Sequence, residues 1–316
     1  MKKFSLVLAL CAATLFTTAQ TYHEDDKEGL RIFLRQASAE AGKINALQLG
    51  LTISDTINWE TDETWVTKIF ELNWDTITPK RLIGIGNSGE QMFSGWYCKN
   101  LAGTLSATKW TKLKTLSCSD NKITDLDLST NTELKYLYSN LNLLTNLDLS
   151  ANIELEVLVC SRNQLTTLDL STNIALRGLS CLYNQLTALD LSTNLALSEL
   201  ACQYNQLTSL KLKNNGLSGI MECFNNRLQL SYLYNVYKNS FIAVLGTQRL
   251  LPKEVAVNSM VDFYAQRQFE GVSTVFTVEK DSVLAIKNTD YTISNGRITF
   301  KSFGHYTVTM TNAAIV

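Results

Sequence analysis

Asparagine returns every 21 residues along the middle of this chain, and this spacing constrains the fold more than any other feature. The positions are Asn100, Asn121, Asn142, Asn163, Asn184, Asn205 and Asn226. Leucine keeps the same interval, and so does cysteine, at Cys118, Cys160, Cys181, Cys202 and Cys223 with Ser139 in the one missing place. A solenoid requires such periodicity because each of its turns repeats one buried bend of the backbone.

The repeating unit reads L-x-x-L-x-C-x-x-N-x-L-T-x-L-D-L-S-x-N and is clearest over 155–173 and 176–194. This pattern is typical of leucine-rich repeats. A single turn buries too few apolar side chains to offset its chain entropy, so neighbouring turns must stack. At each bend, the asparagine amide can pair with backbone groups that lose their sheet partners. We therefore predict a leucine-rich-repeat solenoid over residues 96–234.

The segment before the repeats, residues 20–95, has no such period. Leu30, Phe33 and Leu34 recur at helical spacing there and predict an amphipathic helix. Because the first turn of a solenoid would expose its apolar interior, we expect this segment to form a helical N-terminal cap.

The segment after the repeats, residues 241–316, predicts a β-sandwich. Its apolar residues alternate along short stretches separated by turns, as in strands. The stretches are 255–257, 274–278, 291–293, 297–300 and 306–310. Asn295-Gly296 between two of them is a strong hairpin signal. The segment is short for a sandwich, which leaves open an incomplete domain with an unpaired edge. The fold class expected for the chain is mainly β, or α+β.

The first 19 residues predict a signal peptide. Lys2 and Lys3 precede an apolar stretch from Phe4 to Phe16, and small residues lead to a cleavage site before Gln20. The stretch is too short to span a membrane. We therefore expect a protein that is secreted or exposed at the cell surface.

The composition argues against several functions. With 28 basic and 29 acidic residues, the net charge of −1 supplies no basic surface for nucleic acid. The chain has two histidines and contains no nucleophile elbow, zinc-binding helix motif or phosphate-binding loop. We expect no enzymatic activity, no catalytic residues, no cofactor and no metal. An acidic row leaves calcium as an alternative to a solvated, hydrogen-bonded face: Asp127, Asp148, Asp169 and Asp190.

Export normally favours disulfides, but the cysteine row argues against them. Parallel, in-register side chains on neighbouring strands fit the required disulfide dihedral poorly. We interpret these cysteines as small, buried and reduced apolar residues.

Residues that differ between turns are candidates for binding because the fold does not dictate them. In each strand, the side chains flanking the inward leucine and cysteine are expected on the concave surface of the solenoid. Tyrosine and apolar residues gather there, a composition found at binding hot spots. The predicted partner-binding residues are Tyr136, Tyr138, Val157, Val159, Leu182, Tyr183, Tyr204, Glu222 and Phe224. We expect a protein partner, from a host or from a bacterial surface.

The tryptophans of the N-terminal segment offer an alternative function. Trp59 and Trp65 flank acidic residues and either pack in the core of the cap or form a platform for stacking sugar rings. The second arrangement would make the chain a carbohydrate-binding surface protein.

The repeats resemble those of exported bacterial cysteine-ladder leucine-rich-repeat proteins, with internalin J-like 21-residue units. The likeness rests on Leu158, Cys160, Asn163, Leu165 and Leu168 and their equivalents in the other turns. The stretch 291–312 resembles the immunoglobulin-like domains that follow such repeats. The resemblance implies adhesion or recognition through the repeat surface, and it implies no catalytic residue.

Overall fold

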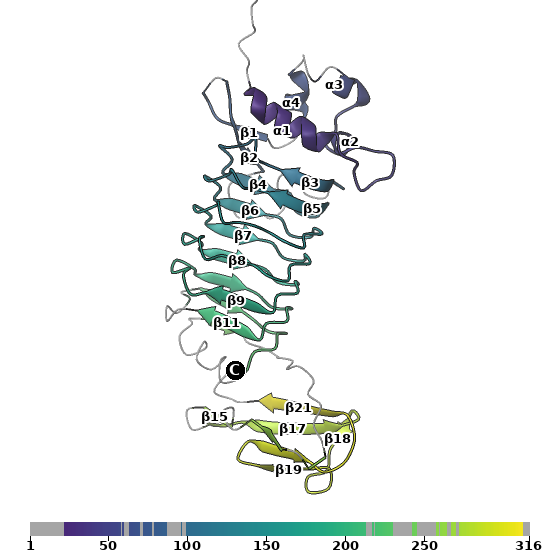
Figure 1. Ribbon diagram of the computed structural model, residues 1–316, viewed down its shortest axis with the longest axis vertical. Coiled ribbons are helices and arrows are strands. Elements are labelled where there is room, and N and C mark those ends of the chain that lie inside the picture. The colour runs from purple at the N-terminus through teal and green to yellow at the C-terminus, as the bar shows by residue number, and fades with distance from the viewer. Residues whose placement is uncertain are drawn as a thin grey trace, which may run out of the picture. The chain divides into compact units, whose positions relative to one another are not determined.

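The computed structural model describes residues 22–57, 59, 63–69, 72–77, 79–86, 96, 99–212, 217, 219–229, 242–244, 257–258, 260–263, 267–269 and 272–311. The predicted signal peptide and most of the stretch 255–257 lie outside these residues. The chain divides into two compact units, Met1–Asn163 and Gln164–Val316. Each unit contains several turns of the repeat (Figure 1).

The first unit begins with helices and continues as repeats. Its helices are α1 (Glu24–Leu34), α2 (Asn45–Gln48), α3 (Ile53–Ile57) and α4 (Thr64–Lys68). Its strands are β1 (Leu72–Trp74), β2 (Leu82–Ile85), β3 (Ala102–Ser106), β4 (Thr115–Ser117), β5 (Lys122–Asp127), β6 (Tyr136–Tyr138) and β7 (Val157–Val159). The predicted amphipathic helix is α1, and its Leu30, Phe33 and Leu34 are buried.

The second unit contains further repeats and the C-terminal strands. The strands of the repeats are β8 (Gly178–Ser180), β9 (Ala188–Leu191), β10 (Glu199–Ala201), β11 (Ser209–Leu212) and β12 (Ile220–Glu222), followed by β13 (Ile242–Val244). The others are β14 (Met260–Asp262), β15 (Gln268–Phe269), β16 (Val272–Ser273), β17 (Val275–Lys280), β18 (Val283–Leu284), β19 (Tyr291–Ser294), β20 (Arg297–Phe300) and β21 (Tyr306–Thr311).

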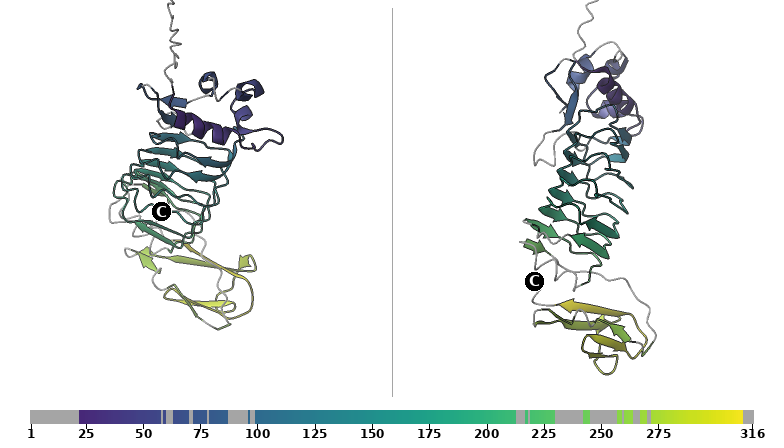
Figure 2. Two further views of the ribbon diagram at one scale, coloured as in Figure 1. Left: turned by 45° about the horizontal axis from the view of Figure 1, so that its top comes forward. Right: turned by 60° about the vertical axis from the view of Figure 1, so that its left-hand side comes forward.

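The repeats form turns of a β-solenoid of the leucine-rich-repeat type in both units, as the 21-residue spacing predicts. In the first unit β2, β4, β6 and β7 pair in parallel, with Leu116, Leu137 and Leu158 in register. In the second, β8, β10 and β12 do the same. Figure 2 shows the stacked strands from two further directions. Strand β13 pairs in parallel with β12, so this sheet continues past the predicted end of the repeats at residue 234.

The asparagine row closes each bend. Asn142 Nδ2 donates to the carbonyls of Cys118 at 3.0 Å and Ser139 at 3.1 Å, and its Oδ1 accepts from the Ile123 amide at 3.0 Å. Asn205 makes the same three contacts in the second unit. One buried side chain thus pairs with backbone groups of its own turn and of the preceding one, which confirms the predicted role.

The C-terminal strands form two three-stranded antiparallel sheets, β14-β20-β19 and β18-β17-β21, and a separate antiparallel pair, β15-β16. Val278 of one sheet and Tyr291 and Ile298 of the other share a hydrophobic core. The predicted hairpin turn is present, since Ser294 pairs with Arg297 and both Asn295 and Gly296 have positive φ. Four of the five predicted strands therefore lie where alternation placed them.

Candidate interaction surface

One backbone position in each turn adopts a conformation that most side chains avoid. It directly precedes the asparagine that recurs every 21 residues. Its φ lies between 51° and 57° in every turn from Asp120 to Asn225. The residues there are Asp120, Leu141, Arg162, Tyr183, Tyr204 and Asn225. Asn and Asp tolerate this left-handed conformation, whereas a bulky side chain costs roughly 1–2 kcal/mol. Tyrosine at two successive turns is therefore not what the backbone favours.

The outward side chains of the strands, and of up to three residues that follow each strand, form a surface that we call the strand face. In the first unit, four of the predicted binding residues lie on it. Tyr136 is opposite Val157 and Tyr138 is opposite Val159 in neighbouring parallel strands. The structure brings these four together, but Tyr138 and Val159 are buried, at 4% and 8% exposure. Tyr136 and Val157 are half-buried, so this part of the face offers little contact area.

The second unit carries the other five predicted residues and more exposed surface. The rings of Tyr183 and Tyr204 stack 4.1 Å apart and within 7° of parallel. Phe224 meets Tyr204 edge-on at 5.3 Å. We call these three residues the aromatic row. Tyr183 and Tyr204 are 36% and 38% exposed, and Leu182 beside them is half-buried.

The fifth residue, Glu222, belongs to a polar pair next to the aromatic row. Gln203 is 7% exposed, and its Nε2 donates to Glu222 Oε2 at 2.8 Å. The Gln203 Oε1 is buried and has no hydrogen-bond partner among the described residues. Glu199 is exposed on β10, and Ala201, two residues further along the same strand, is opposite Glu222 in register. Glu199 lies on β10 and Gln203 two residues after its end, but only the structure shows which of them is buried and what each contacts.

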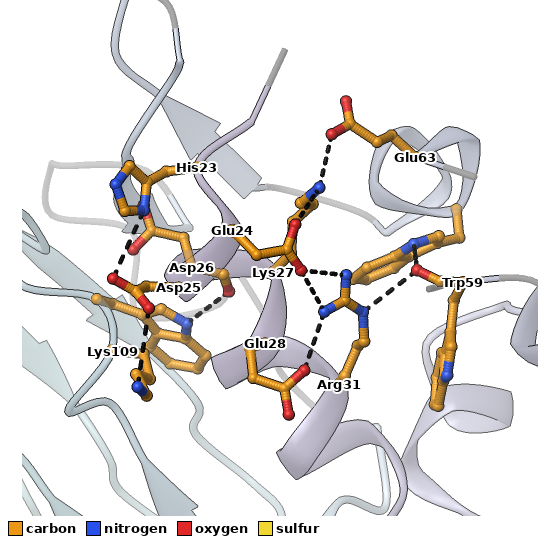
Figure 3. Close-up of polar contacts among 12 residues, drawn as sticks. His23, Glu24, Asp25, Asp26, Lys27, Glu28, Arg31, Trp59, Glu63 and Lys109 are labelled. Atoms are coloured by element: carbon orange, nitrogen blue, oxygen red, sulfur yellow. Dashed lines mark hydrogen bonds and ion pairs between the residues drawn. The ribbon is translucent and has the colours of Figure 1, made fainter. Parts of the chain in front are cut away.

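A second polar cluster, which the sequence analysis missed, lies on helix α1 (Figure 3). Arg31 is 1% exposed and donates to Glu24 Oε1 at 2.7 Å and to Glu28 Oε2 at 2.9 Å. Its Nε also donates to the Trp59 carbonyl at 3.2 Å. Lys27 pairs with Glu24 and with Glu63 from the loop that precedes α4. Each buried cation is matched by carboxylates, so the cluster fastens α1 to its neighbours.

Asp26 anchors the same helix to the sheet. It is fully buried, and its Oδ2 accepts from Arg81 Nε at 2.7 Å and from the Leu82 amide at 2.8 Å. The hydrogen bond from Arg81 to Asp26 is the main cause of a raised pKa at the Arg81 guanidinium. The contact joins α1 to the start of β2, which we interpret as structural.

The tryptophans of this region are not available for a sugar platform. Trp59 is 5% and Trp65 is 1% exposed, and their rings pack edge to face at 6.0 Å. The indole of Trp65 donates to the Trp59 carbonyl. The prediction that these two residues could stack sugar rings is therefore wrong, because their faces are covered by protein.

The acidic row is hydrogen-bonded to its own turns. Asp148 Oδ1 accepts from the Ser150 amide at 2.9 Å, and this bond lowers the pKa of Asp148. The carboxylates of Asp127, Asp169 and Asp190 accept from the serine two residues later in the same way. Among the described residues, no group of His, Cys, Asp and Glu is arranged to hold a metal ion.

The five cysteines of the row are buried thiols. Burial raises the pKa of Cys118 and Cys181 to about 12 and makes their thiolate forms unfavourable. No helix in the part of the chain that the structure describes is long and apolar enough to cross a membrane.

Comparisons with known proteins give structural likeness only. Neither a family model nor a curated protein matches the chain. Among solved structures it is similar to the functional domain of InlJ from Listeria monocytogenes, which includes a cysteine ladder. Their sequence identity is 28% and the TM-score 0.35, over 48% of this chain and 43% of that one.

Two other similar structures are the leucine-rich-repeat domain of APL1B and the internalin InlF from Listeria monocytogenes. For APL1B the identity is 23% and the TM-score 0.41, over 46% of this chain and 44% of that one. For InlF the identity is 19% and the TM-score 0.39, over 59% of this chain and 57% of that one. This chain thus covers less than two thirds of each of the three structures.

Proposed function

We propose that this protein is a non-enzymatic binding protein whose repeats recognise a protein partner through the strand face of the second unit. The observation that carries the proposal is the aromatic row. Tyr183 and Tyr204 are exposed and stacked at a backbone position that disfavours them. Side chains that the fold does not require are candidates for retention by function.

The chemistry of the row suits protein recognition. Tyrosine presents a large, rigid surface with few rotatable bonds, and it is enriched at interface hot spots. Stacking holds the two rings in place before a partner arrives, which reduces the side-chain entropy lost on binding. In the first unit, Tyr136 and Val157 are proposed as secondary contacts because they are half-buried rather than buried.

The remaining parts of the proposal concern location and the flanking segments. The N-terminal sequence pattern supports export to the cell surface or the surrounding medium. Helix α1 and its ion pairs are proposed to cap the repeats. The two C-terminal sheets, with their shared core, are proposed to be an immunoglobulin-like sandwich.

A capture experiment tests the proposal. The chain from Gln20 onward is used as bait against host extracellular proteins and against the producing cell's surface fraction, and mass spectrometry identifies what it holds. The same capture is run with a Tyr183→Asn/Tyr204→Asn variant. A matched control is Ile174→Asn/Leu195→Asn, because these residues are also exposed, apolar and 21 positions apart.

The proposal predicts that a captured protein is lost with the tyrosine variant and kept with the control. Retention by the tyrosine variant would show that the aromatic row is not the binding surface. Loss only with the control would move the site to the row of Ile174 and Leu195.

A further inference from the structure

We infer that the strand face of the second unit recognises a guanidinium group, so that the partner inserts an arginine side chain beside the aromatic row. This inference rests on the proposed function and names the chemistry of the partner. It follows from an unsatisfied acceptor, two carboxylates and exposed aromatic rings on neighbouring turns of the repeat.

The first observation is the buried amide of Gln203. Its Nε2 donates to Glu222, which fixes the other amide atom, Oε1, as an acceptor. That Oε1 is buried and has no partner among the described residues. Buried acceptors in native proteins are nearly always paired, so an orphan beside a carboxylate marks a place where a donor is expected.

The second observation is the charge of this surface. Glu199 and Glu222 lie on the adjacent parallel strands β10 and β12. Within the described residues, neither carboxylate forms an ion pair with Lys, Arg or His. No Lys or Arg occurs among residues 178–183, 199–204 and 220–225. The face is therefore complementary to a cation and would repel an acidic segment.

The third observation distinguishes arginine from lysine. A guanidinium is planar, carries five donors and stacks on aromatic rings, so it can meet Gln203, Glu222 and a tyrosine together. An ammonium group is a strongly hydrated point charge and matches a planar array less well. Tyr204, next to Gln203 in the chain, is 38% exposed and supplies the aromatic contact.

The test uses the chain from Gln20 onward with three immobilised peptides in about 150 mM salt, where distant charges are screened. The peptides share one extended Gly-Ser sequence and carry arginine, lysine or citrulline at the same positions. Citrulline keeps the shape of arginine but is neutral.

The protein variants are Glu222→Gln, Gln203→Leu and Tyr204→Leu. The control Asp169→Asn/Asp190→Asn removes two charges from the hydrogen-bonded acidic row. Thermal unfolding confirms that each variant is folded.

Binding of the arginine peptide is expected to exceed that of the other two peptides. Glu222→Gln should weaken it by roughly tenfold or more, while the control changes it little. The inference is overturned if the lysine or citrulline peptide binds equally well, if no arginine peptide binds, or if Glu222→Gln matches the control. A natural partner that still depends on Tyr183 and Tyr204 would then leave the proposed function intact.

Discussion

At the scale of single residues, the asparagine row explains most of what the sequence predicted correctly. An amide that bridges two turns must recur once per turn, so its interval is visible without a structure. Asn163 shows the arrangement: Nδ2 donates to the Ser139 and Cys160 carbonyls, and Oδ1 accepts from the Leu144 amide. All three contacts are buried.

Replacement of this asparagine tests the role of the row. Asn163→Ala removes every partner that the side chain supplies, and we expect the free energy of unfolding to fall by about 2–4 kcal/mol. Asn146→Ala is the matched control, because Asn146 is exposed, and it should change the value by less than about 0.5 kcal/mol. Urea denaturation followed by circular dichroism measures both. Equal losses of stability in the two variants would show that Asn163 does not stabilise the fold by bridging two turns.

For the tyrosines of the aromatic row, in contrast to the asparagines, we expect replacement to cost little stability. Tyr183→Asn/Tyr204→Asn relieves left-handed strain of roughly 1–2 kcal/mol per residue, but it loses a stacked pair contributing about 0.5–1.5 kcal/mol and some apolar burial. We therefore expect the free energy of unfolding to stay within about 1 kcal/mol of the parent or to rise. A large loss of stability in urea denaturation would mean that the tyrosines serve the fold.

Thiol reactivity tests the burial of the cysteines. Because burial raises the pKa of Cys118 and Cys181 to about 12, we expect neither thiol to react with iodoacetamide in the folded protein at neutral pH. Both should react in denaturant. The folded pKa is the higher one, so the thiols' contribution to stability is complete below pH 9.0 and is lost as the pH rises towards 12. Labelling of Cys118 or Cys181 in the native protein, read by mass spectrometry of peptides, would contradict this account.

At the scale of elements, the predictions succeeded where a local pattern suffices. Helix α1 follows from the spacing of Leu30, Phe33 and Leu34, and the β19–β20 hairpin follows from Asn295-Gly296. The ion pair between Asp26 and Arg81 was out of reach, because the two residues are 55 positions apart and no local pattern joins them. The outward strand positions were visible in the sequence, but the burial of Tyr138 and Val159 depends on what packs around each turn.

The attachment of α1 to the sheet gives a prediction at this scale. Asp26→Asn removes the charge that Arg81 and the Leu82 amide share, and we expect a loss of about 2–3 kcal/mol. Hydrogen exchange should also become faster in α1 and β2. The neighbouring carboxylate of Asp25 is exposed, so Asp25→Asn serves as the control and should leave exchange unchanged. Equal exchange in the two variants would show that Asp26 does not anchor the helix.

At the scale of the whole molecule, one turn of the repeat can be removed without loss of the fold if each turn is stabilised only by in-register stacking on its neighbours. Deletion of residues 185–205 removes one interval and joins Asn184 to Gln206, which preserves the order of every row. We expect this protein to fold, with a lower free energy of unfolding and a smaller urea m-value. Deletion of residues 185–194 breaks the register and should abolish cooperative unfolding. The same cooperative unfolding transition in urea for both deletions would argue against in-register stacking of the turns.

The central claim is that the repeats bind a protein through the strand face of the second unit. Hydroxyl-radical footprinting tests it most directly, because it reports the accessibility of individual side chains. With a captured partner bound, the account predicts that oxidation of Tyr183, Tyr204 and Phe224 falls while that of Ile174 and Leu195 is unchanged. Unchanged oxidation of the aromatic row, with protection elsewhere on the chain, would contradict it.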